Sequence, residues 1–82
     1  MKLPRDLSGE ELARLLGRVG YQVTRQTGSH MRLSRAAEVE HHITIPRHGT
    51  LKVGTLSSIL KDVAEHVGLD RQELIQELWA RG

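Results

Sequence analysis

The segment YQVTRQTGSHMRLSRAAEVEHHITIP, residues 21–46, decides the fold of this 82-residue chain. Polar and apolar residues alternate along it in three runs, and this period of two is typical of strands that are buried on one side. The predicted strands are, in order, a run that starts at Tyr21, residues 30–34 and residues 41–46. The turn residues at 27–29 predict a hairpin, and residues 35–40 form a longer connection.

Helical periodicity surrounds these strands. Residues 9–19 carry leucine and valine on one face and charged side chains on the other, and an apolar stripe recurs in residues 56–67 and 74–79. The residues expected to cap these helices are Ser8 with Glu11 for the first, Thr55 for the second and Asp70 with Glu73 for the third, with Gly20 and Gly68 as stops. The order αβββαα predicts a two-layer α+β fold, in which a three-stranded antiparallel sheet is covered by helices on one face.

Length and composition restrict the class of protein. With 9.2 kDa and a hydrophobic content of 38%, residues 1–82 are expected to form a single domain around one core. The sequence has no cysteine, which excludes disulfides, Cys-based zinc sites and thiol nucleophiles and fits a reducing compartment. No stretch approaches the roughly 18 apolar residues of a membrane span, and the first residues do not resemble a signal peptide. We therefore expect a cytoplasmic protein without membrane contacts.

The charge is unevenly distributed along the chain. Residues 21–55 hold five cationic side chains against two acidic ones, together with four of the five histidines. Residues 56–82 hold three cationic side chains against five acidic ones. A basic middle with an acidic end is typical of one surface for a polyanion and a separate one for a partner or solvent, although so few charges also cluster by chance.

Strand geometry sorts these residues into two faces, because successive side chains point to opposite sides of a sheet. If Met31, Leu33, Ile43 and Ile45 lie beneath the helices, the opposite face holds His30, Arg32, His42 and Thr44. We call this opposite side of the sheet the outer face. It is expected to bring two imidazoles, a guanidinium and a hydroxyl together beside the turn at Gly28.

This set of side chains suits metal-free RNA cleavage, in which the ribose 2′-hydroxyl attacks the neighbouring phosphorus. The reaction needs a base, an acid and cations, and a histidine with a pKa of about 6.5 serves either proton role near neutral pH. His30 is the predicted proton-transfer residue, because the hairpin turn presents it where an RNA backbone can approach. The predicted RNA or phosphate contacts are Gly28, Ser29, Arg32, His42, Arg47 and Lys52, and free N–H groups at the start of the second helix, near Gly54 and Thr55, offer another anion site.

Other site chemistries are disfavoured by spacing and composition. His41 and His42 are adjacent in a strand and point to opposite faces, so no shared metal ion is expected. The segment from Lys52 to Thr55 lacks the GxxxxGK spacing of a P-loop, and no nucleotide cofactor is expected. Base stacking on tyrosine is not expected either, because Tyr21 falls on the inner face. Taken alone, His30 would be an ordinary exposed strand residue.

Four segments together resemble the HicA (YcfA-like) toxin family. They are the capped helix from Ser8 to Gly20, the YQVTRQTGSHMRL hairpin, the HHITIP strand and the HGTLKVGTLSSIL segment. The resemblance implies a fold like that of a double-stranded-RNA-binding domain and the role of an mRNA-cleaving endoribonuclease in a type II toxin–antitoxin system. It also implies inhibition by a HicB-type antitoxin, and it assigns the single catalytic histidine of the family to His30.

Two alternatives to a toxin nuclease stay open at this point. A noncatalytic RNA-binding module would use the same fold and the same basic patch through shape and phosphate contacts. A structural adaptor would carry the same histidines on a solvated sheet. The sequence assigns no role to His41, His48 or His66, and it leaves the second proton-transfer group, the cleavage preference and the oligomeric state undetermined.

Overall fold

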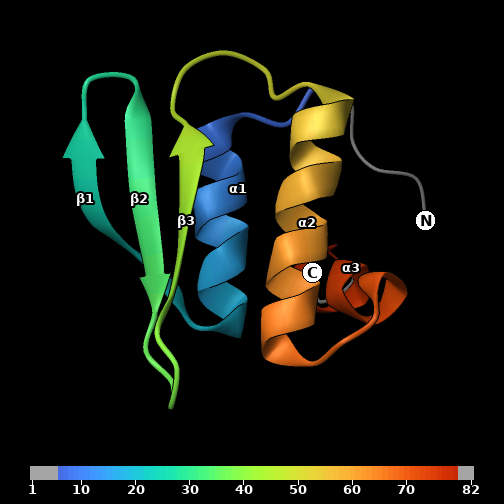
Figure 1. Cartoon of the computed structure of the whole chain (residues 1–82). Coiled ribbons are helices and arrows are strands. Elements are labelled where there is room, and N and C mark those ends of the chain that lie inside the picture. The colour runs from blue at the N-terminus through green and yellow to red at the C-terminus, as the bar shows by residue number, and fades with distance from the viewer. Residues whose placement is uncertain (1–5, 80–82) are drawn as a thin grey trace.

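The computed structural model describes residues 6–79, and its architecture is α+β, as expected (Figure 1). The elements are, in order, α1 (Gly9–Leu16), the 3-10 turn η1 (Gly17–Val19), β1 (Tyr21–Thr27), β2 (His30–Arg35), β3 (His41–Pro46), α2 (Val53–Val67) and α3 (Arg71–Trp79). The three strands form one antiparallel sheet in the order β1-β2-β3. The predicted fold class and element order are confirmed.

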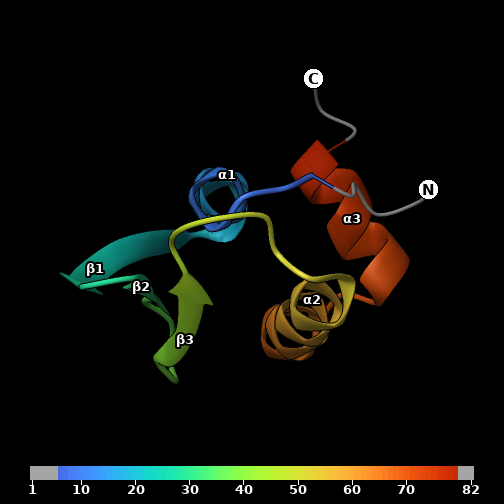
Figure 2. The ribbon, with the colours of Figure 1, turned by 90° about the horizontal axis from the view of Figure 1, so that it is seen from above.

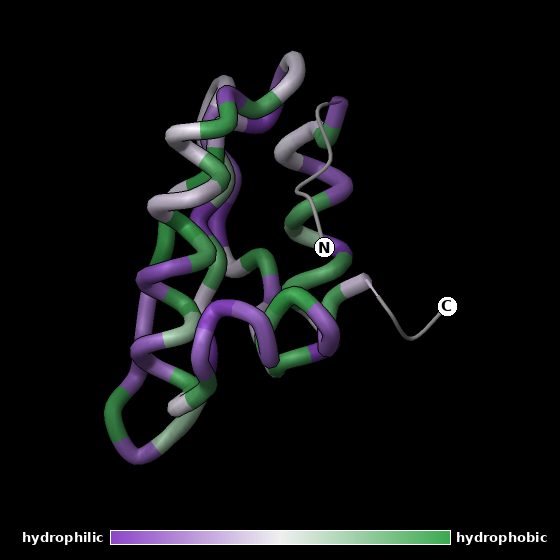
Figure 3. The backbone as a smooth tube through the Cα atoms, turned by 90° about the vertical axis from the view of Figure 1, so that its right-hand side faces the viewer, coloured by the Kyte–Doolittle hydropathy of each residue, from purple (hydrophilic) through white to green (hydrophobic). Residues whose placement is uncertain are grey.

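The helices gather on one side of the sheet. Figure 2 shows α1 against the sheet, α2 beside β3, and α3 farther out, where it packs against α1, η1 and α2. Apolar and polar segments alternate along the helices and strands rather than forming one long apolar run (Figure 3). This alternation is the pattern that lets each element bury one side and expose the other.

The predicted division of the sheet into two faces is confirmed. Met31, Leu33, Ile43 and Ile45 are buried in the core, together with Tyr21 on β1. The side chains of the outer face, His30, Arg32, His42 and Thr44, are exposed. The aliphatic core therefore fixes which polar groups the sheet presents to solvent.

The predicted N-terminal capping residues are confirmed for two of the three helices. Ser8 and Glu11 form the expected capping box, and hydrogen bonds to Ser8 lower the pKa of the Glu11 carboxyl. Asp70 and Glu73 exchange the equivalent pair of bonds before α3. The prediction that Thr55 caps α2 is wrong, because Lys52 is the extended N-cap residue and its carbonyl accepts the first helical bond, from Leu56, at 2.9 Å.

The alternation of β1 is interrupted by a bulge. Val23 lies opposite Leu33 and Arg25 lies opposite Arg32, so Thr24 is an extra residue in β1. Residues after Thr24 therefore face the side opposite to the one that a continuous period of two predicts.

The start of α1 docks closely on the end of β3. A Cβ atom built on Gly9 would lie 1.7 Å from the carbonyl oxygen of Pro46 and 3.1 Å from the Ile45 side chain. Gly9 is buried, and no larger residue fits without a shift of the backbone. This contact places α1 directly behind the strand end that neighbours His30.

We expect Gly9→Ala to lower the free energy of unfolding by at least about 1–3 kcal/mol, because the added methyl group overpacks a backbone contact. Gly17→Ala is the matched control. Gly17 has a right-handed helical conformation, with φ at −57°, and open space around its Cβ position. That substitution should leave stability unchanged or raise it by about 0.4–1 kcal/mol. Urea denaturation of both variants tests the contact, and equal stability of the two would contradict it.

Candidate functional site

The candidate site begins at the tip of the β1–β2 hairpin. Gly28 and Ser29 form the turn between the paired residues Thr27 and His30, and the positive φ of Gly28, 54°, matches the first central position of a type II′ turn. The space beside Gly28 is open, and the His30 side chain is exposed. The Ser29 hydroxyl lies 3.4 Å from Nδ1 of His30. The tip therefore presents an imidazole beside a backbone that another chain can approach.

The tip is tied to the end of β3. His30 pairs with Pro46, and the backbone N–H of Arg47 donates to the Ser29 carbonyl at 2.7 Å. His30 is thus held between two neighbouring strands rather than on a free loop.

Arg32 lies on the same face as His30, two residues along β2, opposite Thr44. This separation is roughly 7 Å at about 3.4 Å per residue. Within residues 6–79, no carboxylate pairs with either side chain. The structure therefore places Arg32, one of the predicted cations, on the same face as His30 and two residues from it.

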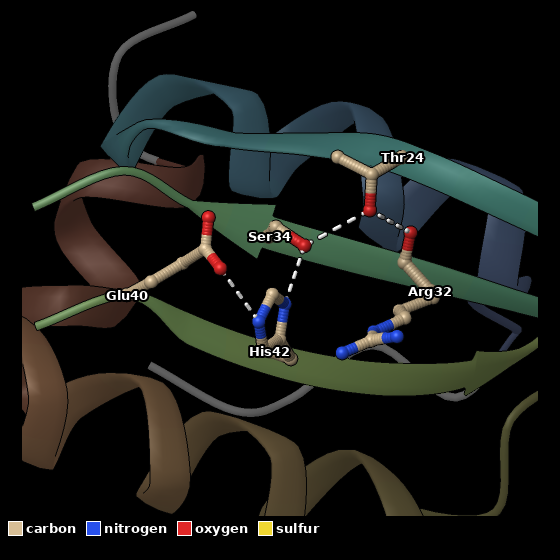
Figure 4. Close-up of polar contacts among 5 residues, drawn as sticks. All are labelled: Thr24, Arg32, Ser34, Glu40 and His42. Atoms are coloured by element: carbon tan, nitrogen blue, oxygen red, sulfur yellow. Dashed lines mark hydrogen bonds and ion pairs between the residues drawn. The ribbon is translucent and has the colours of Figure 1, made fainter.

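His42 is held by a polar chain that the sequence did not reveal (Figure 4). Its Nδ1 lies 2.6 Å from the Ser34 hydroxyl, and its Nε2 lies 2.8 Å from a carboxylate oxygen of Glu40. The Ser34 hydroxyl also contacts the Thr24 hydroxyl at 2.9 Å. Strand parity alone would have put Ser34 on the outer face, but Glu40 comes from the connection that was expected only to link two strands.

His30 and His42 are too far apart to act on one phosphate. His42 pairs with Ser34, which lies four residues from His30 along β2. That is a separation of roughly 13 Å, whereas a proton-transfer group must reach its atom at about 2.6–3.2 Å. The two imidazoles of the outer face therefore face different parts of any extended ligand.

The two remaining predicted cations lie at the same end of the molecule as the hairpin tip but are differently engaged. Nε of Arg47 is buried, has no hydrogen-bond partner among residues 6–79, and lies 4.0 Å from a carboxylate oxygen of Glu10 on α1. Lys52 is exposed at the start of α2, where the N–H groups of residues 53–55, including the predicted Gly54 and Thr55, precede the first helical hydrogen bond. The structure thus joins Arg47 to the hairpin through its backbone and directs its side chain toward α1.

A second polar cluster joins β1 and β3 to α2 at the other end of these strands. The Tyr21 hydroxyl lies 2.6 Å from Nδ1 of His41, and Nε2 of His41 lies 3.2 Å from Asp62. The ring of His66 stacks on His41 with 4.4 Å between the ring centroids, and its buried Nε2 has no hydrogen-bond partner in the described part of the chain. Burial raises the pKa of Tyr21 to about 12.

Partial burial, followed by the nearby His41 ring and the guanidinium of Arg35, lowers the pKa of His66, while Asp62 opposes this shift. The sequence missed this cluster because its members come from three separate elements, β1, β3 and α2.

Residues 6–79 contain no group of three or more His, Asp or Glu side chains arranged to hold a metal ion. No helix in this part of the chain is long and apolar enough to cross a membrane.

Comparison with protein families gave one finding. The model of the family described as "HicA toxin of bacterial toxin-antitoxin" matches residues 9–64, about two thirds of the chain. The match runs from α1 into α2 and includes the hairpin tip and the whole outer face. Neither the comparison with curated proteins nor that with solved structures gave a match.

The lowered pKa of His66 predicts that stability falls on mild acidification. As the pH drops below 6.5, the ordinary pKa of histidine, this side chain is protonated in the unfolded chain but stays neutral in the native state. The contribution of this group is complete above pH 6.5 and is lost as pH falls toward the lowered pKa. We expect His66→Gln to flatten the fall in unfolding free energy between pH 7.5 and about pH 5.5.

The exposed His48 supplies the matched control. Denaturant titrations at several pH values should show that His48→Gln keeps the pH dependence of the parent protein. An equal slope in both variants would rule out His66 as its source.

Proposed function

The chain belongs to the HicA toxin family of bacterial toxin–antitoxin systems, and from this premise we propose that it is a metal-independent endoribonuclease that cleaves mRNA on its outer face. Such a toxin of a type II system would act in the cytoplasm, where messenger RNA is translated. The observation that carries the proposal is the position of His30. It is an exposed imidazole at a glycine turn, and two residues away on the same face lies the guanidinium of Arg32, which pairs with no carboxylate among residues 6–79.

In the proposed reaction, His30 acts on the 2′-hydroxyl of the nucleotide that precedes the scissile phosphate. His30 removes the proton from this hydroxyl, the oxygen forms a new bond to phosphorus, and the bond from phosphorus to the 5′-oxygen breaks. The leaving oxygen takes a proton from the protonated imidazole or from water. The products are a 2′,3′-cyclic phosphate end and a 5′-hydroxyl end, and no oxidant or cofactor is consumed.

The proposed contacts to RNA surround this imidazole. Arg32 would bind phosphate oxygens through its planar fork, and the open backbone at Gly28 and Ser29 would let the RNA strand come close. Lys52 and Arg47 would contact more distant phosphates, the latter after leaving Glu10. His42 would contact RNA through its ring face, because Ser34 and Glu40 occupy both of its nitrogens.

A toxin of this family has an antitoxin partner, and we propose that the partner is of the HicB type. An antitoxin that covered the outer face would exclude RNA from His30. The acidic side chains of α2 and α3 offer a separate surface for a partner or for a second copy of the chain.

His30→Ala should slow RNA cleavage strongly while the protein stays folded, because the side chain is exposed and does not belong to the hydrophobic core. Purified protein is incubated with messenger RNA in EDTA, and fragments are resolved on a gel with analysis of their ends. We expect the parent protein to give 2′,3′-cyclic phosphate ends and the variant to be slower by about 10²–10⁴-fold. His48→Ala, a matched exposed histidine, should cleave normally.

Two results would contradict the proposal. Cleavage by His30→Ala at the parent rate would remove His30 from the reaction. Salt-dependent binding of RNA by the parent protein without any cleavage would favour the noncatalytic RNA-binding module instead.

A further inference from the structure

The bulge in β1 moves a second arginine to the outer face. With an unbroken period of two, Arg25 would share the inner side with Tyr21 and Val23. The extra residue, Thr24, shifts the register so that Arg25 lies directly opposite Arg32 and is exposed. Directly opposite residues of an antiparallel pair point to the same side of a sheet, so both guanidinium groups belong to the outer face.

The residues on either side of the bulge confirm this change of side. Gln26, which follows Arg25, lies opposite the buried Met31. Gln26 and Val23 both line a groove of about 620 Å³ between the inner side of the hairpin and α1. The inner side therefore holds Val23 before the bulge and Gln26 after it, and both Thr24 and Arg25 fall on the outer face.

Hydrogen bonds of the Thr24 side chain hold the bulge in place. The Thr24 hydroxyl donates to the Arg32 carbonyl at 3.4 Å and lies 2.9 Å from the Ser34 hydroxyl (Figure 4). Ser34 in turn contacts His42. Through Ser34, Thr24 therefore links the segment that carries Arg25 to the polar chain that holds His42.

Two opposed arginines are unfavourable in the absence of an anion. Their Cα atoms are separated by only about 4.5–5.5 Å in such a pair, and like charges directly opposite each other destabilise a sheet. Within residues 6–79, no carboxylate pairs with Arg25 or Arg32. A bound anion of two or more oxygens would turn this repulsion into two charge-assisted interactions.

We propose that Arg25 and Arg32 form a two-guanidinium subsite for one phosphate of the RNA strand, next to the phosphate at His30. This inference rests on the proposed function and extends it to a residue that neither the sequence pattern nor the family match assigns. The pair lies two residues from His30 along β2, roughly 7 Å away, so neighbouring phosphates of one extended strand can occupy both places. Its position beside His30 favours RNA over an acidic protein segment.

The test measures binding of a short single-stranded RNA of mixed sequence to the full chain at several salt concentrations. His30→Ala serves as the parent, so that the probe stays intact. Adding Arg25→Gln should weaken binding about tenfold, the loss of one charge-assisted contact. It should also reduce the slope of log affinity against log salt by about 0.7, the value for one phosphate on a single strand.

Two control variants separate the position of the charge from its amount. Arg71→Gln removes the same charge from an exposed site on α3 and should change affinity by less than about twofold. The transposed variant, Arg25→Gln with Gln26→Arg, keeps the composition and net charge but moves the guanidinium to the inner side. We expect it to bind RNA as weakly as Arg25→Gln alone, with circular dichroism confirming that each variant is folded.

Three outcomes would overturn the subsite. They are equal losses in Arg25→Gln and Arg71→Gln, full binding by the transposed variant, and loss of antitoxin binding in Arg25→Gln with RNA binding unchanged. The last outcome would assign the arginine pair to a protein partner. The proposed function is judged separately by cleavage of RNA with His30 intact, so the nuclease proposal can fail while the phosphate subsite stands, and the reverse.

Discussion

The outer face depends on the central strand, β2, which is hydrogen-bonded to β1 on one edge and to β3 on the other. Met31 and Leu33 are buried beneath the helices. Because side chains alternate along a strand, His30 and Arg32 then point to the opposite face, where they are exposed. A slip of one residue would put His30 and Arg32 into the core and two aliphatic side chains into water. The same burial that stabilises the domain therefore fixes the orientation of the residues proposed to act on RNA.

The sheet end that carries His30 is also supported from behind. Gly9 brings the start of α1 against the Pro46 carbonyl, and the Leu51 N–H donates to the Leu7 carbonyl at 2.8 Å. An isolated bridge between Ser8 and Thr50 adds a further tie between the first helix and the loop after β3. These contacts fix the end of β3, which pairs with His30, and the loop that follows it. The hairpin tip is therefore attached to a rigid part of the fold and is not a free loop.

Strand parity predicted the two faces of β2 and β3 because each strand there pairs without interruption. It failed on β1, since Thr24 fits the polar and apolar alternation as well as any normal strand residue, and its hydroxyl partner Ser34 lies ten residues away. The prediction that Thr55 caps the second helix failed because the helix starts earlier. Its N-cap residue is Lys52, which has an extended backbone and makes no side-chain capping bond, so no capping residue marks the start in the sequence. Likewise, no local pattern could indicate that Arg47 turns toward Glu10 on the first helix. Short-range periodicity identified what the domain buries, whereas contacts between distant segments decided where several charges point.

The distribution of groups on the outer face also limits how the proposed nuclease could recognise RNA. The chain has one tryptophan, one tyrosine and no phenylalanine, and the tyrosine is buried, so successive bases have no aromatic platform. What the face offers instead is one imidazole at its rim, an arginine pair beside it and a second imidazole whose nitrogens are both engaged. Phosphate contacts of this kind supply affinity without reading sequence. If the proposed nuclease prefers certain cleavage positions, the preference must come from base edges near the hairpin tip or from the shape of the RNA, because cations that bind phosphates do not distinguish one nucleotide from another.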